Sequence, residues 1–183
     1  MKLIVAVDEQ WGIGRNNELL FSIPEDKIFF KESTVGKIVV MGHNTLKSLP
    51  SSLPLKNRIN IILTRDNSIK IAGAIVCGSI NQLGSVLSMC LSDEVFVIGG
   101  HSIYAQLIDY CDEAYVTKIF SKKNADRFFP NIDAADNWEI IEKSQTKTFD
   151  GIDYCFLKYK NLMPKKIEAS GCEADSQNAD IMP

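Results

Sequence analysis

The sequence has little of what a metal site or a disulfide framework needs. It contains five cysteines and two histidines in 183 residues. The cysteines, at positions 77, 90, 111, 155 and 172, form neither a CxxC pair nor a Cys/His spacing suited to zinc. Their odd number also argues against a complete set of disulfides. We therefore expect no metal cofactor and a reducing, cytoplasmic location.

Long hydrophobic segments are missing as well. The longest stretch without a charged residue, positions 71–92, holds three glycines, four serines, Asn81 and Gln82, which makes it too polar to cross a membrane. The apolar run at the N-terminus is short and ends at Asp8 without the small-residue pattern of a signal-peptide cleavage site. We therefore expect no membrane partner.

Positive charge is also scarce. The chain has 20 Lys and Arg against 23 Asp and Glu, a net charge of −3, so it lacks the basic excess of nucleic-acid-binding proteins. An anionic ligand must then be held by a few placed cations, and arginine binds carboxylates and phosphates in a bidentate manner. The candidates are Arg15, Arg58, Arg65 and Arg127. We expect a monomer that binds small molecules and no nucleic acid.

Short apolar runs recur along the chain and predict eight strands. The central runs are continuously hydrophobic, as in strands buried on both faces, and helical patterns lie between several of them. The expected fold is α/β, with a mainly parallel eight-stranded central sheet flanked by about four helices. The strands are expected at Leu3–Val7, Ile38–Met41, Ile59–Leu63, Ala74–Cys77, Val95–Ile98, Ala114–Ile119, Trp138–Ile141 and Tyr154–Tyr159, and helices at Pro24–Thr34, Ile80–Leu91 and Ser102–Tyr110.

The C-terminal part has a different pattern. Residues 144–153 are polar and contain the turn pair Asp150-Gly151, so we expect the last two strands to form an antiparallel hairpin at the edge of the sheet. Residues 161–183 have no aromatic side chain and no periodicity, as in disordered segments. The chain is therefore divided into a folded domain at 1–160 and a polar, disordered tail at 161–183.

An acidic side chain stands at the expected start of the first helix. Ser22 with Glu25 three residues later matches a capping box, and Pro24 suits the first helical position. Asp26 then lies in the first turn, where a carboxylate either complements the helix dipole from an exposed position or, in a partly apolar wall, has a raised pKa and protonates a nitrogen heterocycle. The same helix face is expected to hold Phe29, Phe30 and Ser33.

Three expected strands end in residues suited to a phosphorylated ligand. Gly42, Gly99 and Gly100 follow two of them and allow close approach of the backbone, and Thr64-Arg65 follows the third. Ligands of open α/β sheets bind at such carboxyl ends, so we expect an extended ligand with several phosphates. The chain lacks GxGxxG, Walker A, HExxH and GxSxG patterns, which leaves redox chemistry or binding alone. Residues 12–21 are either mobile surface or a gating lid.

In their order and spacing, these segments resemble the dihydrofolate reductases of the bacterial chromosomal type over roughly residues 1–160. The resemblance is carried by Leu3–Asp8, Gly12–Gly14, Ile23–Asp26 with Phe30-Lys31, Val40–Gly42 with Thr45, Arg58 with Asn60–Arg65, Val97–Gly100 with Tyr104, Tyr115–Thr117, Phe129-Pro130 and Tyr154–Phe156.

The resemblance implies a catalytic domain at 1–160, NADPH as the cofactor, and reduction of 7,8-dihydrofolate to 5,6,7,8-tetrahydrofolate by hydride transfer to C6 and protonation of N5. It implies catalytic roles for Asp26 and Thr117, with Phe21 where the family has a tryptophan that helps to organise water. The implied substrate-binding residues are Val5, Ala6, Asp26, Lys27, Phe30, Leu49, Arg58, Ile98, Tyr104 and Thr117. The implied cofactor-binding residues are Ala6, Ile13, Gly14, Gly42, His43, Asn44, Thr45, Leu63, Thr64, Arg65, Gly99, Gly100, His101, Ser102, Ile103 and Tyr104.

The chain departs from the family at three places. Leu20-Phe21 replaces Pro-Trp, Lys27 replaces an apolar residue after the catalytic acid, and His43 replaces a common arginine. We expect Lys27 to weaken the fit of diaminopyrimidine inhibitors, and His43 to lose phosphate affinity as the pH rises above about 6.5. Two alternatives stay open: a related pyrimidine reductase of riboflavin biosynthesis, and a non-catalytic NADP-binding module.

Overall fold

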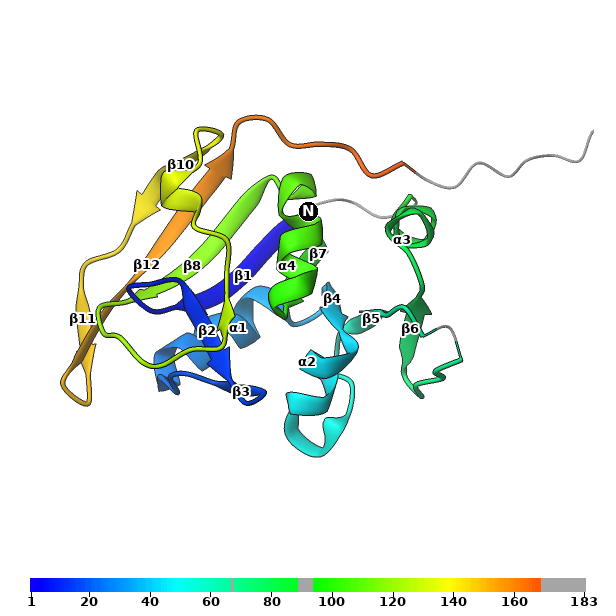
Figure 1. The fold of residues 1–183 in the computed structure, drawn as a ribbon, viewed down its shortest axis with the longest axis horizontal. Helices are drawn as coiled ribbons and strands as arrows, with labels where there is room; N and C mark the ends of the chain where they lie inside the picture. The colour runs from blue at the N-terminus through cyan, green and yellow to red at the C-terminus, as the bar shows by residue number, and fades with distance from the viewer. Residues whose placement is uncertain (67, 89–93, 169–183) are drawn as a thin grey trace, which may run out of the picture.

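The computed structural model describes residues 1–66, 68–88 and 94–168. Its centre is a sheet with the strand order β10-β12-β8-β1-β7-β4-β5-β6, to which β11 adds by pairing with β12 (Figure 1). The path from β8 to β6 is parallel, and β12 pairs antiparallel with β8, β10 and β11. The strands of this sheet are β1 (Lys2–Val7), β4 (Ile38–Gly42), β5 (Ile59–Leu63), β6 (Ala74–Cys77), β7 (Val95–Gly99), β8 (Glu113–Ile119), β10 (Trp138–Lys143), β11 (Lys147–Phe149) and β12 (Ile152–Asn161).

Alternate residues of β1 show how the sheet is covered on both faces. Leu3, Val5 and Val7 pack into one apolar cluster together with Leu107, whereas Ile4 belongs to a second cluster with Leu46. The first cluster is covered by α3 (Ile80–Leu87) and α4 (His101–Leu107), and the second by α1 (Pro24–Thr34) and α2 (His43–Ser48). Figure 1 shows α4 in front of the sheet and α1 behind it. The central strands are therefore buried on both faces, as their continuous hydrophobic runs predict.

This architecture confirms the expected fold: a mainly parallel central sheet with an antiparallel C-terminal edge and four α-helices among the described residues. The eight expected strands are present with their ends shifted by two residues or fewer. The helix expected at Ile80–Leu91 is α3, and positions 89–91 of it lie outside the described residues. The helix expected at Ser102–Tyr110 is split into α4 and the 3₁₀ turn η3 (Ile108–Tyr110).

The capping-box interpretation of the first helix is wrong. Helix α1 begins at Pro24 as expected, but its N-cap is Ile23, and no side chain of the described residues caps its N-terminus. Ser22 is exposed and one position too early for the cap. The Glu25 side chain bonds to Lys147 and Tyr154 instead of reaching back to the backbone. Contacts from the β11–β12 hairpin, more than 120 residues further along the chain, therefore replace the local cap.

Most of the segment that was expected to be mobile surface or a lid, residues 12–21, belongs to a second, small sheet. It has the order β3-β2-β9, with β2 at Gly12–Arg15, β3 at Glu18–Leu19 and β9 at Arg127–Phe128. The tight β2–β3 turn contains Asn16 and Asn17, both at positive φ, a conformation that asparagine tolerates better than most residues. The buried carboxylate of Asp8 accepts hydrogen bonds from the backbone N–H groups of Gln10, Gly12 and Lys123, which joins this sheet to the central one.

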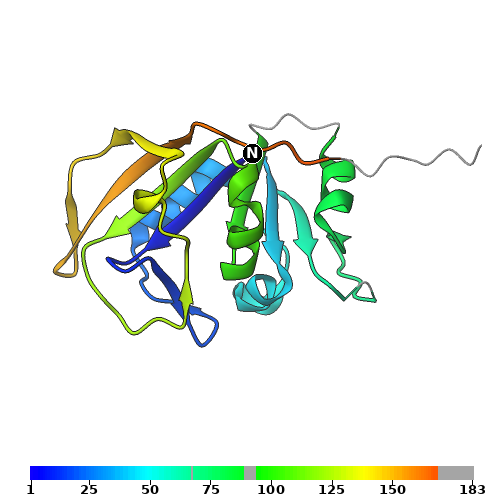
Figure 2. The same ribbon diagram turned by 45° about the horizontal axis from the view of Figure 1, so that its top comes forward.

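The remaining short elements are 3₁₀ turns at η1 (Pro50–Ser52) and η4 (Ile132–Ala134). After β12 the chain runs along one end of the molecule toward α3 (Figures 1 and 2). Ile167 packs against the core cluster beside Gly84, and Lys165 forms an ion pair with Asp109 at 2.6 Å. Both residues belong to the first part of the expected tail, which therefore contacts the folded domain. Positions 169–183 lie outside the described residues. None of the described helices is long and apolar enough to cross a membrane.

Candidate active site

A cleft of about 540 Å³ opens between α1, the β2–β3 hairpin and the start of α4. The middle of β1, the carboxyl-terminal end of β7 and the turn after α2 also contribute lining residues. The residues that line it are Ile4, Val5, Ala6, Ile13, Gly14, Arg15, Asn17, Glu18, Leu19, Asp26, Lys27, Phe30, Ser48, Leu49, Pro50, Ile98, Gly100, His101, Tyr104 and Arg127.

Asp26 presents a carboxyl group to this cleft from the first turn of α1. Its Oδ1 accepts a hydrogen bond of 2.6 Å from the hydroxyl of Thr117, a buried residue of β8. Burial raises the pKa of Asp26, although the Thr117 hydrogen bond and the Lys27 charge oppose the rise. The other carboxylate among the described lining residues, Glu18, is exposed on the hairpin. Asp26 is therefore the acid that is placed to exchange a proton with a ligand in the cleft.

The wall around Asp26 is mostly apolar. Phe30 lies one turn further along α1 and lines the cleft, as do Leu49 and Ile98. Phe29 is not a lining residue, since its ring packs on Phe156 at a centroid distance of 4.8 Å. The helix face that the sequence predicts for both aromatic rings is thus divided between the cleft and the underlying sheet.

Tyr104 connects the cleft to the central strand. It is buried, and its hydroxyl donates a hydrogen bond of 2.7 Å to the backbone carbonyl of Ile4 in β1. Burial and the negative charge of Asp26 both raise the pKa of the Tyr104 hydroxyl. It therefore stays protonated and holds α4 against β1 beside the acid.

Arg58 lies just before β5 and is not a lining residue of the cleft. Its Nε and Nη2 donate to the hydroxyl of Thr34 at 3.2 and 3.0 Å, and Nη1 donates to the carbonyl of Lys56 at 2.8 Å. Nη2 also approaches the carbonyl of Lys31 at 3.4 Å. These contacts fix the guanidinium plane against the C-terminal end of α1, while burial lowers the pKa of Arg58.

Three glycines allow the ends of β4 and β7 to meet the helices that follow them. A Cβ on Gly42 would lie 2.9 Å from Ile103, and one on Gly99, whose φ is +105°, would lie 2.6 Å from the Tyr104 ring. A Cβ on Gly100 would approach the Thr45 hydroxyl at 3.1 Å. The first turns of α2 and α4 therefore lie together at one edge of the sheet, with their backbone close to the mouth of the cleft.

The sequence-derived site residues fall into two groups in space. The structure brings together in the cleft, or in direct contact with Asp26, the residues Val5, Ala6, Ile13, Gly14, Asp26, Lys27, Phe30, Leu49, Ile98, Gly100, His101, Tyr104 and Thr117. The residues outside the lining are Phe21, Gly42, His43, Asn44, Thr45, Arg58, Leu63, Thr64, Arg65, Gly99, Ser102 and Ile103. Most of the second group surround the ends of β4, β5 and β7, whereas Phe21 packs with Ile23, Ile119 and Tyr154.

Several lining residues were given no role by sequence reasoning. Arg15 and Arg127 had been noted among the four arginines, and both prove to line the cleft, from β2 and β9. The pairing of β2 with β9, which brings these two arginines to the same cleft, joins segments more than 100 residues apart, and no sequence signal predicts it. No sequence signal places the remaining lining residues there either. These remaining residues are Ile4, Asn17, Glu18, Leu19, Ser48 and Pro50.

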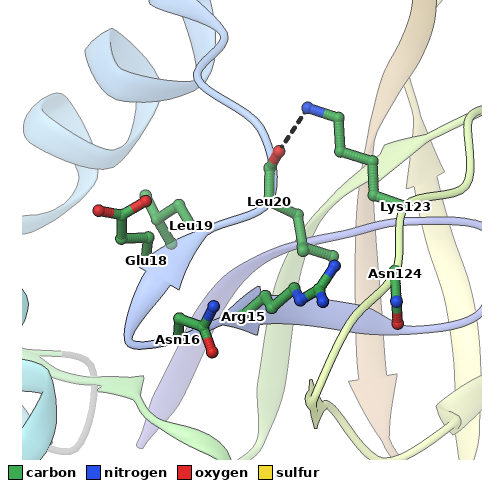
Figure 3. Close-up of a pocket in the computed structure, with 7 residues that line it drawn as sticks. All are labelled: Arg15, Asn16, Glu18, Leu19, Leu20, Lys123 and Asn124. Carbon is green, nitrogen blue, oxygen red and sulfur yellow. Dashed lines mark hydrogen bonds between the residues drawn. The ribbon is translucent and has the colours of Figure 1, made fainter.

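A second hollow of about 410 Å³ is lined by the β2–β3 hairpin and by Leu20, Lys123 and Asn124 (Figure 3). Lys123 closes one side by donating a hydrogen bond of 2.7 Å from Nζ to the carbonyl of Leu20. Arg15 and Glu18 line this hollow as well as the main cleft. Nowhere in the described part of the chain are three His, Cys, Asp or Glu side chains grouped closely enough to hold a metal ion.

Comparisons with known proteins agree with this geometry. Residues 1–161 match the family model described as dihydrofolate reductase. A dihydrofolate reductase of Bacillus subtilis (strain 168) is 36% identical over 169 residues, which cover 91% of this chain and 97% of that protein. One from Staphylococcus haemolyticus is 33% identical, covering 88% and 96% of the two chains. The solved structure of the Enterococcus faecalis dihydrofolate reductase complexed with NADP(H) and RAB-propyl superimposes with a TM-score of 0.75 at 30% identity, covering 87% of this chain and 95% of that one.

Proposed function

The chain belongs to the dihydrofolate reductase family, and we propose that the cleft beside Asp26 is its catalytic site. The protein reduces 7,8-dihydrofolate to 5,6,7,8-tetrahydrofolate, and bound NADPH supplies the hydride for C6. The family match and the curated relatives support this activity over that of a pyrimidine reductase. The observation on which the site assignment rests is the hydrogen bond by which the buried Thr117 holds Asp26, a lining residue of the cleft.

Asp26 is proposed to bind the pteridine and to assist protonation of N5. Because burial raises its pKa, a larger fraction of the carboxyl group is protonated near neutral pH than in an exposed aspartate, as a proton donor requires. Thr117 fixes the orientation of the carboxyl group, so that one oxygen stays available to the ligand. The rate is then expected to fall as the pH rises through the pKa of Asp26.

The apolar residues of the cleft are proposed to hold the substrate rings. Phe30 packs on the pteridine and aminobenzoyl groups, and Leu49 and Ile98 form the opposite walls. Val5 and Ala6 lie beneath the pteridine, and Lys27 stands at the rim. Such walls exclude water from the reacting atoms, which strengthens the electrostatic effect of the Asp26 carboxyl group.

Arg58 is proposed to bind the α-carboxylate of the glutamyl group. The guanidinium group already donates to Thr34, Lys31 and Lys56, which supports the assignment because a fixed donor plane loses little entropy when a carboxylate binds. This residue lies outside the lined cleft, at the far end of α1. The proposed substrate therefore extends along the helix from Asp26 to Arg58.

The cofactor is proposed to bind across the ends of β4, β5 and β7. The glycine contacts described above support this fit, since a side chain in place of Gly42 or Gly99 would overlap Ile103 or Tyr104, and one in place of Gly100 would crowd Thr45, all of which belong to the binding edge. Ala6, Ile13 and Gly14 would contact the nicotinamide, and Thr64 with Arg65 the 2′-phosphate. The diphosphate would meet backbone N–H groups and side chains of Gly42–Thr45 and Gly99–Tyr104, with Leu63 below.

The remaining assignments stay predictions. The Nζ of Lys123 lies 4.3 Å from the centroid of the Phe21 ring. Phe21 is proposed to shield the water that delivers the proton to N5, although its side chain cannot donate a hydrogen bond to that water. The 1–160 catalytic domain, the monomeric state and the cytoplasmic location are proposed on the sequence features alone.

Substitution of Arg58 tests where the substrate lies. Arg58→Lys should raise the KM for dihydrofolate about tenfold or more, because a bidentate charge-assisted pair becomes a single contact. With dihydropteroate, which lacks the glutamate, the variant and the wild type should have the same KM. An equal rise with both substrates would remove Arg58 from carboxylate binding.

A further inference from the structure

The residue before Asp26 is held as firmly as Asp26 itself. Tyr154 of β12 donates a hydrogen bond of 2.6 Å from its hydroxyl to Oε2 of Glu25, and the ammonium group of Lys147 in β11 pairs with Oε1. Asp26 receives its hydrogen bond from Thr117 of β8. Since Thr117 and Phe156 are register partners on β8 and β12, two consecutive residues of α1 are bound by one pair of strands.

These contacts take the place of a helix cap. No side chain of the described residues caps the N-terminus of α1, and the N-cap Ile23 instead packs with Tyr154 and Ile119 in a buried cluster. An uncapped first turn frays readily. Besides the Thr117–Asp26 hydrogen bond, the first turn of α1 is therefore fixed by the Ile23 contact and by the bonds to Glu25.

The hydrogen bond from Tyr154 to Glu25 joins a neutral phenol to an ionised carboxylate near neutral pH. Hydrogen bonds from Lys147 and Tyr154 lower the pKa of Glu25, so its carboxylate is ionised. The same bond is the main cause that raises the pKa of Tyr154 to about 12, so the phenol stays protonated and donates. Hydrogen bonds to an ionised acceptor are stronger than those between neutral groups.

We propose that Glu25 and Tyr154 are positioning residues of this enzyme: their hydrogen bond fixes the first turn of α1, and with it the direction in which Asp26 meets the substrate. The inference rests on the proposed role of Asp26. The ion pair with Lys147 contributes little, since the Lys147 and Glu25 side chains are 44% and 42% exposed and exposed ion pairs are weak. Tyr154, by contrast, is 3% exposed.

Four variants separate these contacts. Tyr154→Phe and Glu25→Ala remove the hydrogen bond from opposite sides. Glu25→Gln keeps an oxygen that accepts from Tyr154 but loses the charge, and Lys147→Met removes only the ion pair. We expect Tyr154→Phe and Glu25→Ala to lower kcat/KM for dihydrofolate about tenfold at pH 7, because small misplacements of a reacting group are costly. Glu25→Gln should recover most of the loss of Glu25→Ala, and Lys147→Met should keep the wild-type rate.

The pH dependence identifies a positioning effect. The charged and titratable groups around Asp26 are Lys27 beside it, Glu25 before it, Tyr104 of α4 and Tyr154 of β12. Tyr154→Phe removes no charge, so any shift comes from movement of Asp26. A displaced carboxyl group becomes more solvated and its hydrogen bond with Thr117 weakens. Burial is the larger of these two effects on the pKa of Asp26, so the pKa should fall in this variant, and the rate should decline at a lower pH than in the wild type.

A second readout does not depend on activity. The ¹³C signal of the Asp26 carboxyl group, followed through a pH titration of the ligand-free protein, should show the same fall of its pKa in Tyr154→Phe and Glu25→Ala, and the dissociation constant for NADPH should stay within twofold. An unchanged titration with a wild-type rate in Tyr154→Phe would overturn the inference, as would an equal loss in Glu25→Gln and Glu25→Ala. Failure of the proposed function itself would show as an inactive wild type. If Tyr154→Phe does not fold, Glu25→Ala tests the same hydrogen bond, because the Glu25 side chain is 42% exposed and its removal leaves the core intact.

Discussion

The hydroxyl of Thr117 and the carboxyl group of Asp26 lie 2.6 Å apart, although 91 positions separate the two residues in the chain. Thr117 belongs to β8, which pairs with β1 and β12 inside the sheet, and Asp26 to the first turn of α1. The helix is thus attached to the sheet at the proposed catalytic residue. Burial raises the pKa of Asp26 and this hydrogen bond lowers it, so the balance between the two sets the pH range in which the acid works.

Replacing Asp26 is predicted to stabilise the protein at high pH. The pKa of Asp26 in the fold is raised above its ordinary value of 3.8, so its favourable contribution is complete below pH 3.8 and is lost as the pH rises through the folded-state pKa. Asp26→Asn is neutral throughout and still accepts from Thr117. Urea unfolding at pH 4.5 and 8 should show that the stability of the variant relative to wild type increases with pH.

The exposed Asp136 provides the matched control for that experiment. Asp136→Asn should leave the unfolding free energy within about 0.5 kcal/mol of wild type, with the same difference at both pH values. A pH-independent effect of Asp26→Asn would contradict the raised pKa of Asp26.

Thr117→Val is predicted to move the pH profile upward. The Thr117 hydroxyl stabilises the ionised carboxylate, so its loss raises the pKa of Asp26 further. The decline of kcat/KM with pH should therefore begin at a higher pH, while kcat/KM at the optimum falls about three- to tenfold because the carboxyl group is less well oriented. Thr117→Ser keeps the hydroxyl and should retain the wild-type profile. A Ser variant that behaves like Val would assign the effect to packing.

Lys27→Leu is predicted to strengthen inhibition by 2,4-diaminopyrimidines. Lys27 lines the cleft directly after the acid, where its positive charge opposes a protonated inhibitor and offers no apolar wall. The inhibition constant should fall about three- to tenfold in the variant. The exposed Lys47 in the last turn of α2 serves as the control through Lys47→Leu. An unchanged inhibition constant in Lys27→Leu would refute the prediction.

The segment after β12 is predicted to contribute to stability. Ile167 packs on the core cluster next to Gly84, whose missing side chain leaves the space for it. Ile167→Ala should lower the unfolding free energy by about 1 kcal/mol, since the side chain is half-buried. Met163, which is 75% exposed, is the control, and Met163→Ala should change stability by less than 0.5 kcal/mol. Equal stability of both variants would show that the 162–168 segment contributes nothing.

The fold could be predicted because its main strands are recognisable from the hydrophobic pattern of their own sequence. Runs such as Ile38–Met41 are buried on both faces and are hydrophobic without interruption. Strands β2, β3, β9 and β11 were missed since they are two to four residues long and form only through pairing with distant partners, such as Gly12 with Phe128. The capping box failed for a related reason: the Glu25 partners come from residues 147 and 154, and no local pattern reveals them.

The candidate site follows the same division. Asp26 could be singled out from its helical position beside Phe30, and the ends of β4 and β7 from their glycines. Arg15 and Arg127 could be named but not placed, because the β2–β9 pairing decides where they point. The pairing of Thr117 with Asp26 came from family resemblance, and spacing alone does not contain it.

The most direct measurement follows absorbance at the NADPH band while purified wild-type and Asp26→Asn proteins act on dihydrofolate at pH 7. Wild type should oxidise NADPH only when dihydrofolate is present, and the variant should be slower by about a hundredfold or more, the range expected for loss of a general acid. Glu18→Gln, at the exposed rim of the cleft, tests whether any carboxylate of the cleft suffices and should remain within a fewfold of wild type. A wild type without substrate-dependent oxidation, or an Asp26→Asn variant of full activity, would contradict the account.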